Sequence, residues 1–273
     1  MKQIIAGLLL IASATAAQAQ RSTMRMGVGY QRTWMVDKQA SPLKYQSSEK
    51  TFSLEYHRRG AKSKFNVGLT GSMGAFFPTG FENRKFYDPG YNADGSPKRD
   101  SSSMTGTLYT GRFSLGYTRK MHGGTAKNDL QSSSYLGGSV SNQLFYSDNI
   151  VRTGWLNAST FNADYLRDFQ FKSKHLVEFK ISIPLFGIAT RLPYHNTVSS
   201  PRSESDIKTF FRRGSRFTTL ADLQNLRVSV GYTYAASKKL GIGVQYFGQW
   251  LRYSKEEPVT LFQNNIGLNI SIK

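Results

Sequence analysis

Apolar and polar residues alternate with a period of two along most of the chain. In the clearest run, 226–234, every even position is apolar or aromatic, and the runs 240–250 and 265–272 follow the same pattern. Successive side chains of a strand point to opposite faces, so this alternation predicts β-strands with one apolar face.

Applied to the whole chain, the pattern predicts ten strands. Each has at least the roughly nine residues that a tilted strand needs to cross a bilayer. The predicted strands are 24–35, 50–58, 63–77, 104–120, 131–147, 154–169, 175–190, 222–235, 239–253 and 259–273. We expect no amphipathic helical segment between them, and a further hairpin within 191–220 would raise the number to twelve.

The second face of these strands is small and neutral. In 240–250 and 265–272 it consists largely of Gly, Gln, Asn and Ser. A strand of a soluble sandwich would also alternate, but the strands here are long and numerous. Apolar residues facing lipid and polar residues facing a lumen are typical of membrane barrels. The fold class predicted is all-β, a transmembrane antiparallel up-and-down β-barrel of about ten strands.

The connections support this assignment. If the first strand runs outward, the two longest connections, 78–103 and 191–221, both lie outside the cell. The turns at 59–62 and 236–238 then lie on the periplasmic side and are short. Long outer loops and short inner turns are characteristic of such barrels.

Aromatic residues divide between the two ends of the predicted strands. The tryptophans fall near the outer ends, and three tyrosines fall near the inner ends. Amphipathic rings prefer the headgroup level of a membrane, so we expect two aromatic girdles. The predicted interface residues are Trp34, Trp155, Trp250, Tyr117, Tyr165 and Tyr234.

The N-terminal segment 1–19 has the features of a secretory signal peptide. Lys2 provides the positive charge, 4–12 is a short apolar stretch, and Ala-Gln-Ala at 17–19 is a cleavage site. We expect cleavage after Ala19, export, and a barrel formed by residues 20–273.

Composition then excludes several classes. The chain has 273 residues, a net charge of +19 and no cysteine, which excludes a disulfide scaffold. Such a charge invites a nucleic-acid interpretation. Export argues against it, and we expect no nucleic-acid partner.

The chain resembles the broad class of Gram-negative outer-membrane β-barrel proteins. The resemblance rests on the signal peptide, the alternating strands and the closing segment 264–273. It covers nearly the whole mature chain and implies an outer-membrane location, without indicating a single family. The chain departs from the class in ending at Lys273, where many members end in an aromatic residue.

Several charged residues project to the predicted lumen. A ten-stranded barrel is narrow, and isolated charges inside it would be costly, so we expect paired networks. This favours a salt-bridged plug. A narrow, mildly anion-preferring pore and a gated or ligand-binding lumen are the alternatives. The predicted lumen charge network comprises Arg25, Glu55, His57, Arg112, Asp164, Glu178, Lys180 and Arg227.

Two places could support catalysis. Glu55 and His57 share one strand face, and His195 lies close to Ser199 and Ser200 in a long outer loop. A carboxylate can orient a His base, and a Ser–His pair can carry out acyl transfer. However, the local motifs of outer-membrane phospholipases and omptin-like proteases are not matched. No two His have metal-ligand spacing. We therefore predict no enzymatic activity, no metal and no cofactor.

The outer loops are rich in basic residues, among them Arg212, Arg213 and Arg216. These could contact the phosphates of outer-membrane lipid and lipopolysaccharide, although ordinary solvated loop charge explains them equally well. We expect the neighbouring Phe210, Phe211 and Phe217 to pack a loop against the barrel mouth.

Together these patterns predict a non-enzymatic outer-membrane barrel that is plugged or forms a narrow passive pore, with long basic extracellular loops. The alternatives are an outer-membrane hydrolase of lipase or protease type that uses a His at the barrel mouth, and an envelope docking or assembly subunit with an unidentified partner.

Overall fold

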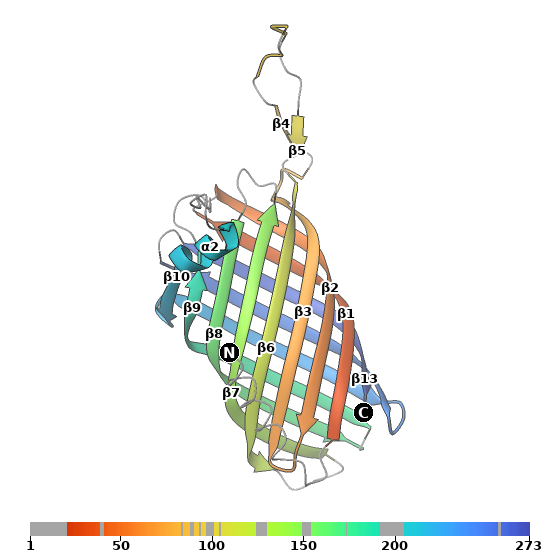
Figure 1. Cartoon of the computed structure of the whole chain (residues 1–273). Coiled ribbons are helices and arrows are strands. Elements are labelled where there is room, and N and C mark those ends of the chain that lie inside the picture. The colour runs from red at the N-terminus through yellow and green to blue at the C-terminus, as the bar shows by residue number, and fades with distance from the viewer. Residues whose placement is uncertain are drawn as a thin grey trace.

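In the computed structural model, ten long antiparallel strands form one closed barrel (Figure 1). Each strand pairs with the next along the chain, and β13 pairs with β1 from Met24↔Ile272 to Asp37↔Val259, which closes the wall. The ten strands are β1 (Arg21–Asp37), β2 (Ser41–Arg59), β3 (Ser63–Pro78), β6 (Gly106–Gly123), β7 (Leu130–Asp148), β8 (Gly154–Phe171), β9 (His175–Thr190), β11 (Leu223–Ala235), β12 (Leu240–Tyr253) and β13 (Val259–Ile272). The predicted ten-stranded barrel is confirmed.

The structure describes residues 21–38, 41–82, 84–87, 90–92, 94–96, 101–103, 105–123, 130–148, 154–172, 174–191, 205–255 and 258–273. The predicted signal peptide and its cleavage site lie outside these residues, so they stay predictions.

The faces of the strands follow the sequence pattern. On β13, Ile266, Leu268 and Ile270 are exposed on the outside of the barrel, while Asn269 and Ser271 are buried in the lumen. An apolar exterior around a polar lumen suits a barrel whose solvent is lipid. The fold is that of Gram-negative outer-membrane β-barrel proteins.

The two ends of the barrel differ as predicted. The connections 60–62, 124–129, 172–174 and 236–239 at one end are short. The two longest connections, 79–105 and 191–222, lie at the other end. We therefore assign the first end to the periplasm and call it the inner end, and we call the second the outer end.

The segment 191–222 corrects two expectations. Instead of another hairpin it holds a helix, α2 (Asp206–Gly214), and a short strand, β10 (Ser215–Thr219). Both the expectation of no helix and the twelve-stranded alternative are therefore wrong. The helix is too short for its period to stand out in the sequence. Ser205 caps it by accepting a bond from the amide of Lys208, and Phe210 is buried.

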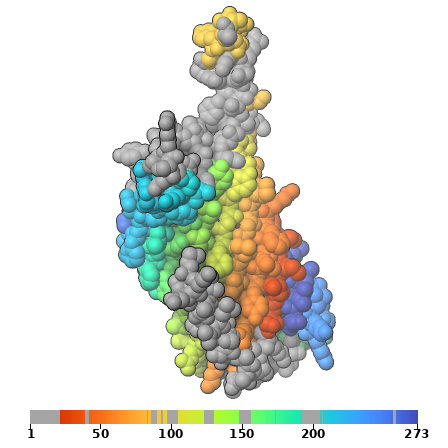
Figure 2. All heavy atoms as spheres, viewed as in Figure 1, coloured from red at the N-terminus to blue at the C-terminus, as the bar shows by residue number. Residues whose placement is uncertain are grey.

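The helix lies on the outside of the barrel near the outer rim (Figure 2). In the part of the chain that the structure describes, no helix has the length and apolar character needed to span a membrane.

Strand β9 changes its neighbour partway along its length. Its inner half, up to Ser182, pairs with β11, and its outer part, from Phe186, pairs with β10. Pro184 lies between the two halves and has no N–H to donate to a ladder. A bulge against β8 falls at the same level. The added strand β10 is therefore attached to the outer part of β9, outside the ring of ten.

Strand β2 begins at Ser41, nine residues earlier than predicted. In this outer extension Tyr45 and Ser47 are buried in the lumen, but the alternate positions Lys44 and Ser48 are polar and exposed. The prediction required apolar residues at alternate positions, and polar residues occupy the outward-facing positions of this extension.

Candidate functional site

The outer part of the lumen is filled by apolar side chains. These residues form one buried cluster, and every one of the ten barrel strands contributes to it. We call the cluster the apolar cap. Its members are Met35, Tyr45, Phe76, Leu108, Phe145, Leu156, Ala158, Ala189, Leu223, Leu251, Tyr253, Val259 and Leu261. The cap closes the outer end of the lumen with side chains packed as in a protein core.

Below the cap lies a layer of hydrogen-bonded amides. Gln143 and Gln249 face each other across the barrel and exchange bonds of 2.9 and 2.6 Å. Gln249 also donates to Asn225 at 2.7 Å, and Gln263 donates to Thr33 at 3.1 Å. We call this the amide layer. Its members are almost completely buried, and their mutual bonds satisfy polar groups that have left water.

Glu49 lies at the same level and is 0% exposed. Its carboxylate accepts bonds from Gln31 at 2.8 Å, from Thr33 at 2.5 Å and from Ser72. Hydrogen bonds from three neutral donors stabilise the carboxylate in place of a cation. The predicted lumen charges did not include Glu49, because the predicted strand began only at residue 50.

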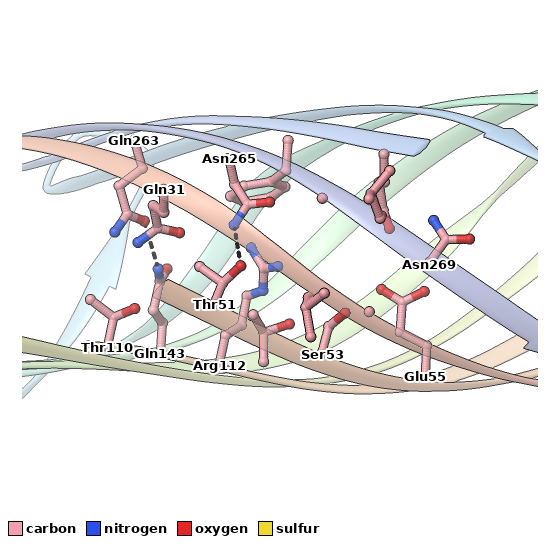
Figure 3. Close-up of a pocket in the computed structure, with 17 residues that line it drawn as sticks. Gln31, Thr51, Ser53, Glu55, Thr110, Arg112, Gln143, Gln263, Asn265 and Asn269 are labelled. Carbon is pink, nitrogen blue, oxygen red and sulfur yellow. Dashed lines mark hydrogen bonds between the residues drawn. The ribbon is translucent and has the colours of Figure 1, made fainter. Parts of the chain in front are cut away.

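A small cavity of about 40 Å³ follows below the amide layer (Figure 3). Arg112 and Glu55 point into it, and Asn265 donates a 3.0 Å bond to Thr51 across one side.

The inner half of the lumen is lined by charged residues. Arg25 pairs with Glu178 at 2.8 Å and with Glu55 at 3.7 Å. Glu55 also contacts His57 at 2.9 Å. Residues on β1, β2 and β9 are thus brought together across the lumen. The sequence indicated only that these residues face the lumen, not that they contact one another.

Three members of this inner network were missing from the predicted set. Lys64 bridges Asp168 at 2.6 Å and Glu178 at 3.4 Å, and Arg59 also pairs with Asp168. Arg59 was assigned to a turn, but β2 extends to include it. Lys64 and Asp168 both face the lumen near the inner ends of their strands, so a stricter projection of alternation could have found them.

A second group of the network lies around Asp164. Lys180 pairs with Asp164 at 2.8 Å, and Ser182 donates to the same carboxylate at 2.6 Å. Arg227 donates to Ser182 at 3.1 Å and contacts the carboxylate only through that hydroxyl.

Arg112 and Arg227 differ from the other predicted lumen cations. Among the described residues, the ion pairs of the inner lumen use Arg25, Arg59, Lys64 and Lys180 as their permanent cations. Arg112 instead lies over the ring of Phe247, 4.0 Å from its centroid. The expectation that the lumen charges are paired therefore does not extend to these two arginines.

Two larger cavities lie in this inner half. A central cavity of about 140 Å³ is lined by Arg112, Arg227 and Lys180 among others. A second cavity of about 190 Å³ lies at the inner mouth and includes Arg59 and Lys273 in its lining. Arg25, His57, Lys64 and Glu178 line both cavities and form the partition between them.

Five of the six predicted interface aromatics, all except Trp155, lie on the outer surface of the barrel. Trp34 and Trp250 occupy one row across the strands, each paired with Phe262 of β13. The rings of Trp34 and Phe262 are 5.8 Å apart. Tyr117 and Tyr234 are exposed toward the inner end, and Tyr165 lies near Ser134 there. The side chain of Trp155 lies outside the described residues.

The predicted basic loop residues occupy the helix and the added strand. Arg212 and Arg213 form the last turn of α2, and Arg216 belongs to β10. Phe210 is buried. Phe211 and Phe217, however, are 45% and 63% exposed, and the ring of Phe217 lies 6.3 Å from that of Phe186 on the outer face of β9. The expectation that all three rings pack a loop against the mouth is therefore wrong.

Of the candidate catalytic residues, the structure describes only Glu55 and His57. His57 contacts Glu55 within the ion network. His195, Ser199 and Ser200 lie outside the described residues. Within the described residues, no group of three or more His, Cys, Asp or Glu side chains is placed to hold a metal ion.

No protein-family model and no curated protein sequence matches the chain. Its fold is similar to that of several solved outer-membrane barrels. The outer membrane protease OmpT from Escherichia coli is 8% identical, with 94% of this chain and 97% of that chain covered and a TM-score of 0.49. Neisserial surface protein A is 7% identical over 94% and 99%, with a TM-score of 0.36. The transport unit of the Escherichia coli autotransporter AIDA-I is 8% identical over 98% and 96%, with a TM-score of 0.44. These values are too low to assign an activity.

Proposed function

We propose that the protein is a non-enzymatic outer-membrane barrel that is closed to passive flow and displays structures on its outer rim. The apolar cap carries this proposal, because every barrel strand contributes a buried side chain to it. An ion that crossed the barrel would have to pass this packed apolar layer, and such layers block conduction by excluding water.

The amide layer strengthens the barrier. Gln143 and Gln249 bond directly across the barrel, so their polar groups are engaged with each other. A plugged lumen is favoured over the narrow passive pore for this reason.

The displayed structures include a slender hairpin. Its two short strands, β4 (Lys85–Tyr87) and β5 (Ser101–Ser103), project well beyond the barrel end (Figure 1). Near its tip, Tyr91 is 73% exposed. An exposed aromatic residue on a projecting hairpin is suited to contact another molecule.

The tip itself contains an ordered turn. The amide of Asn92 donates to the carbonyl of Ser96 at 2.8 Å, and Gly95 adopts a positive φ of 80°. Asp94 accepts bonds from the amide and hydroxyl of Ser96, at 2.9 and 2.6 Å, and these bonds lower the pKa of its carboxyl. A preordered turn loses little entropy on binding a partner.

A lipid partner is proposed for α2 and β10. Exposed Phe211 and Phe217 lie close in sequence to Arg212, Arg213 and Arg216. Apolar rings with neighbouring cations suit an interface rich in lipopolysaccharide phosphate.

Conductance of the refolded full chain in planar bilayers tests the closed barrel. We expect no steady open current from the wild type. A variant that carries Phe76→Ala, Leu108→Ala and Leu251→Ala should conduct, because all three substitutions remove side chains from the cap.

The matched control carries Phe113→Ala, Leu69→Ala and Leu268→Ala, which remove exposed side chains from the lipid face. It should stay closed. A steady ohmic current from the wild type, equal to that of the cap variant, would refute the proposal.

A further inference from the structure

The inner lumen contains more positive than negative charge. The network there consists of six permanent cations and four carboxylates. The cations are Arg25, Arg59, Lys64, Arg112, Lys180 and Arg227, and the carboxylates are Glu55, Asp164, Asp168 and Glu178. Each carboxylate already pairs with at least one of the other four cations. The two excess charges are therefore those of Arg112 and Arg227.

The two arginines line the same central cavity of about 140 Å³. By this measure a single water needs roughly 10–15 Å³, so the cavity has space for several waters or for a tetrahedral oxyanion. An anion there would lie near two guanidinium groups and Lys180, in a lining that also includes Glu55 and Glu178.

Arg227 is only 7% exposed, and its Nε has no hydrogen-bond partner among the described residues. A buried N–H group without an acceptor is costly, and natural proteins seldom leave one unsatisfied. Its Nη2 is fixed by the bond to Ser182, which holds the guanidinium at the cavity wall.

Arg112 is held in a different way. Its guanidinium lies on the face of Phe247, which orients the group while leaving its edge N–H donors available. A planar guanidinium can bind two oxygens of a phosphate or sulfate at once.

The inner mouth provides a route to this cavity. Its lining includes Arg58, Arg59, Lys174 and Lys273, and Glu178 is the one acidic side chain among the described residues that line it. A cleft lined by one sign of charge concentrates ions of the opposite sign. The partition formed by Arg25, His57, Lys64 and Glu178 lies between this mouth and the central cavity.

We infer that the central cavity is a binding site for one small oxyanion of phosphate or sulfate size, held by Arg112 and Arg227 and supplied from the periplasmic side. The site is independent of the closed outer end, because both cavities lie below the amide layer. It would operate equally in a barrel that conducts.

Isothermal titration of the full chain in detergent micelles tests the site, with inorganic phosphate and sulfate as probes and chloride at equal ionic strength as the reference. We expect saturable binding of one oxyanion per barrel. Arg112→Gln and Arg227→Gln should each weaken it at least tenfold. Arg119→Gln removes the same charge from an outward-facing position on the same strand, β6, and should bind as the wild type does.

Thermal unfolding distinguishes a binding role from a structural one. Without oxyanion, Arg112→Gln and Arg227→Gln should unfold at the same temperature as the wild type or higher, because each removes a buried charge that has no direct ion pair. Phosphate should raise the unfolding temperature of the wild type and not that of these variants. If the wild type shows no saturable binding, or if both variants bind phosphate as tightly as Arg119→Gln, the site does not exist.

Discussion

The outer and inner halves of the lumen are enclosed by the same ten strands, yet they are filled in different ways. The outer half contains the apolar cap, the amide layer, the carboxylate of Glu49, which is held by neutral donors, and a buried ion pair of Arg191 with Asp37. The inner half contains ion pairs, two cavities and two arginines without a carboxylate. The first resembles a protein core and the second a solvated charge network.

The difference shows that one barrel can combine a rigid seal with an adaptable interior. A packed apolar layer has few alternative arrangements, whereas side chains next to a cavity can exchange partners. The effects of substitutions on the free energy of unfolding should therefore differ between the two halves, both in size and in their sensitivity to salt.

The largest effect is expected in the cap. Leu251 is completely buried, and Leu251→Ala should lower the free energy of unfolding by about 2–5 kcal/mol, because it removes apolar contacts and leaves a cavity. Urea unfolding followed by tryptophan fluorescence measures this. Leu268→Ala, on the lipid face, should cost clearly less. Equal losses would mean that the cap is loosely packed.

The next largest effect concerns Glu49. Glu49→Gln replaces one carboxylate oxygen by an amide N–H₂, which donates hydrogen bonds and cannot accept them. The bonds from Gln31, Thr33 and Ser72 then cannot all be kept. We expect a loss of about 1–3 kcal/mol in the same urea assay. The loss should not change with salt. An unchanged stability would show that the carboxylate is already protonated or solvated there.

A smaller effect is expected in the ion network. Asp168→Asn removes the shared partner of Arg59 and Lys64, but Arg59 is 38% exposed and Lys64 retains Glu178. Water and the remaining carboxylate offset part of the loss, so we expect about 1–2 kcal/mol. Added salt should reduce the difference from wild type by screening. A salt-independent loss would contradict the solvated character of the inner half.

The smallest effect is expected at His57. The imidazole is 33% exposed and contacts Glu55, which also pairs with Arg25. His57→Gln should cost less than about 1 kcal/mol at neutral pH. Lipid and peptide turnover should be absent in both proteins. Turnover by the wild type that is lost on substitution would assign His57 a catalytic role.

Much of this arrangement could be predicted from the alternation of residues. The period of two located ten strands, and projecting it placed Arg25, Glu55, Glu178 and Lys180 in the lumen. Alternation failed to locate a strand where its outward face was no longer apolar. The outer extension of β2 carries polar residues on both faces, so Glu49 was missed.

The pairing inside the lumen could not be predicted in the same way. Alternation says which face a side chain occupies, but not which residues of distant strands meet across the barrel. Lys64 and Asp168 are 104 residues apart in the chain, and only the closure of the wall brings them together. The amide layer is a similar case, because nothing in the positions of Gln143 and Gln249 indicates that they bond to each other.

The sequence by itself indicated a barrel of about ten strands, its lipid and lumen faces and the difference between its two ends, because each follows from local periodicity and loop length. The tertiary structure alone decided that apolar side chains pack together in the outer part of the lumen, that β10 is added beside Pro184, and that Arg112 and Arg227 form no direct ion pair with a carboxylate. These features depend on barrel closure and strand register, which set distances between residues far apart in the chain.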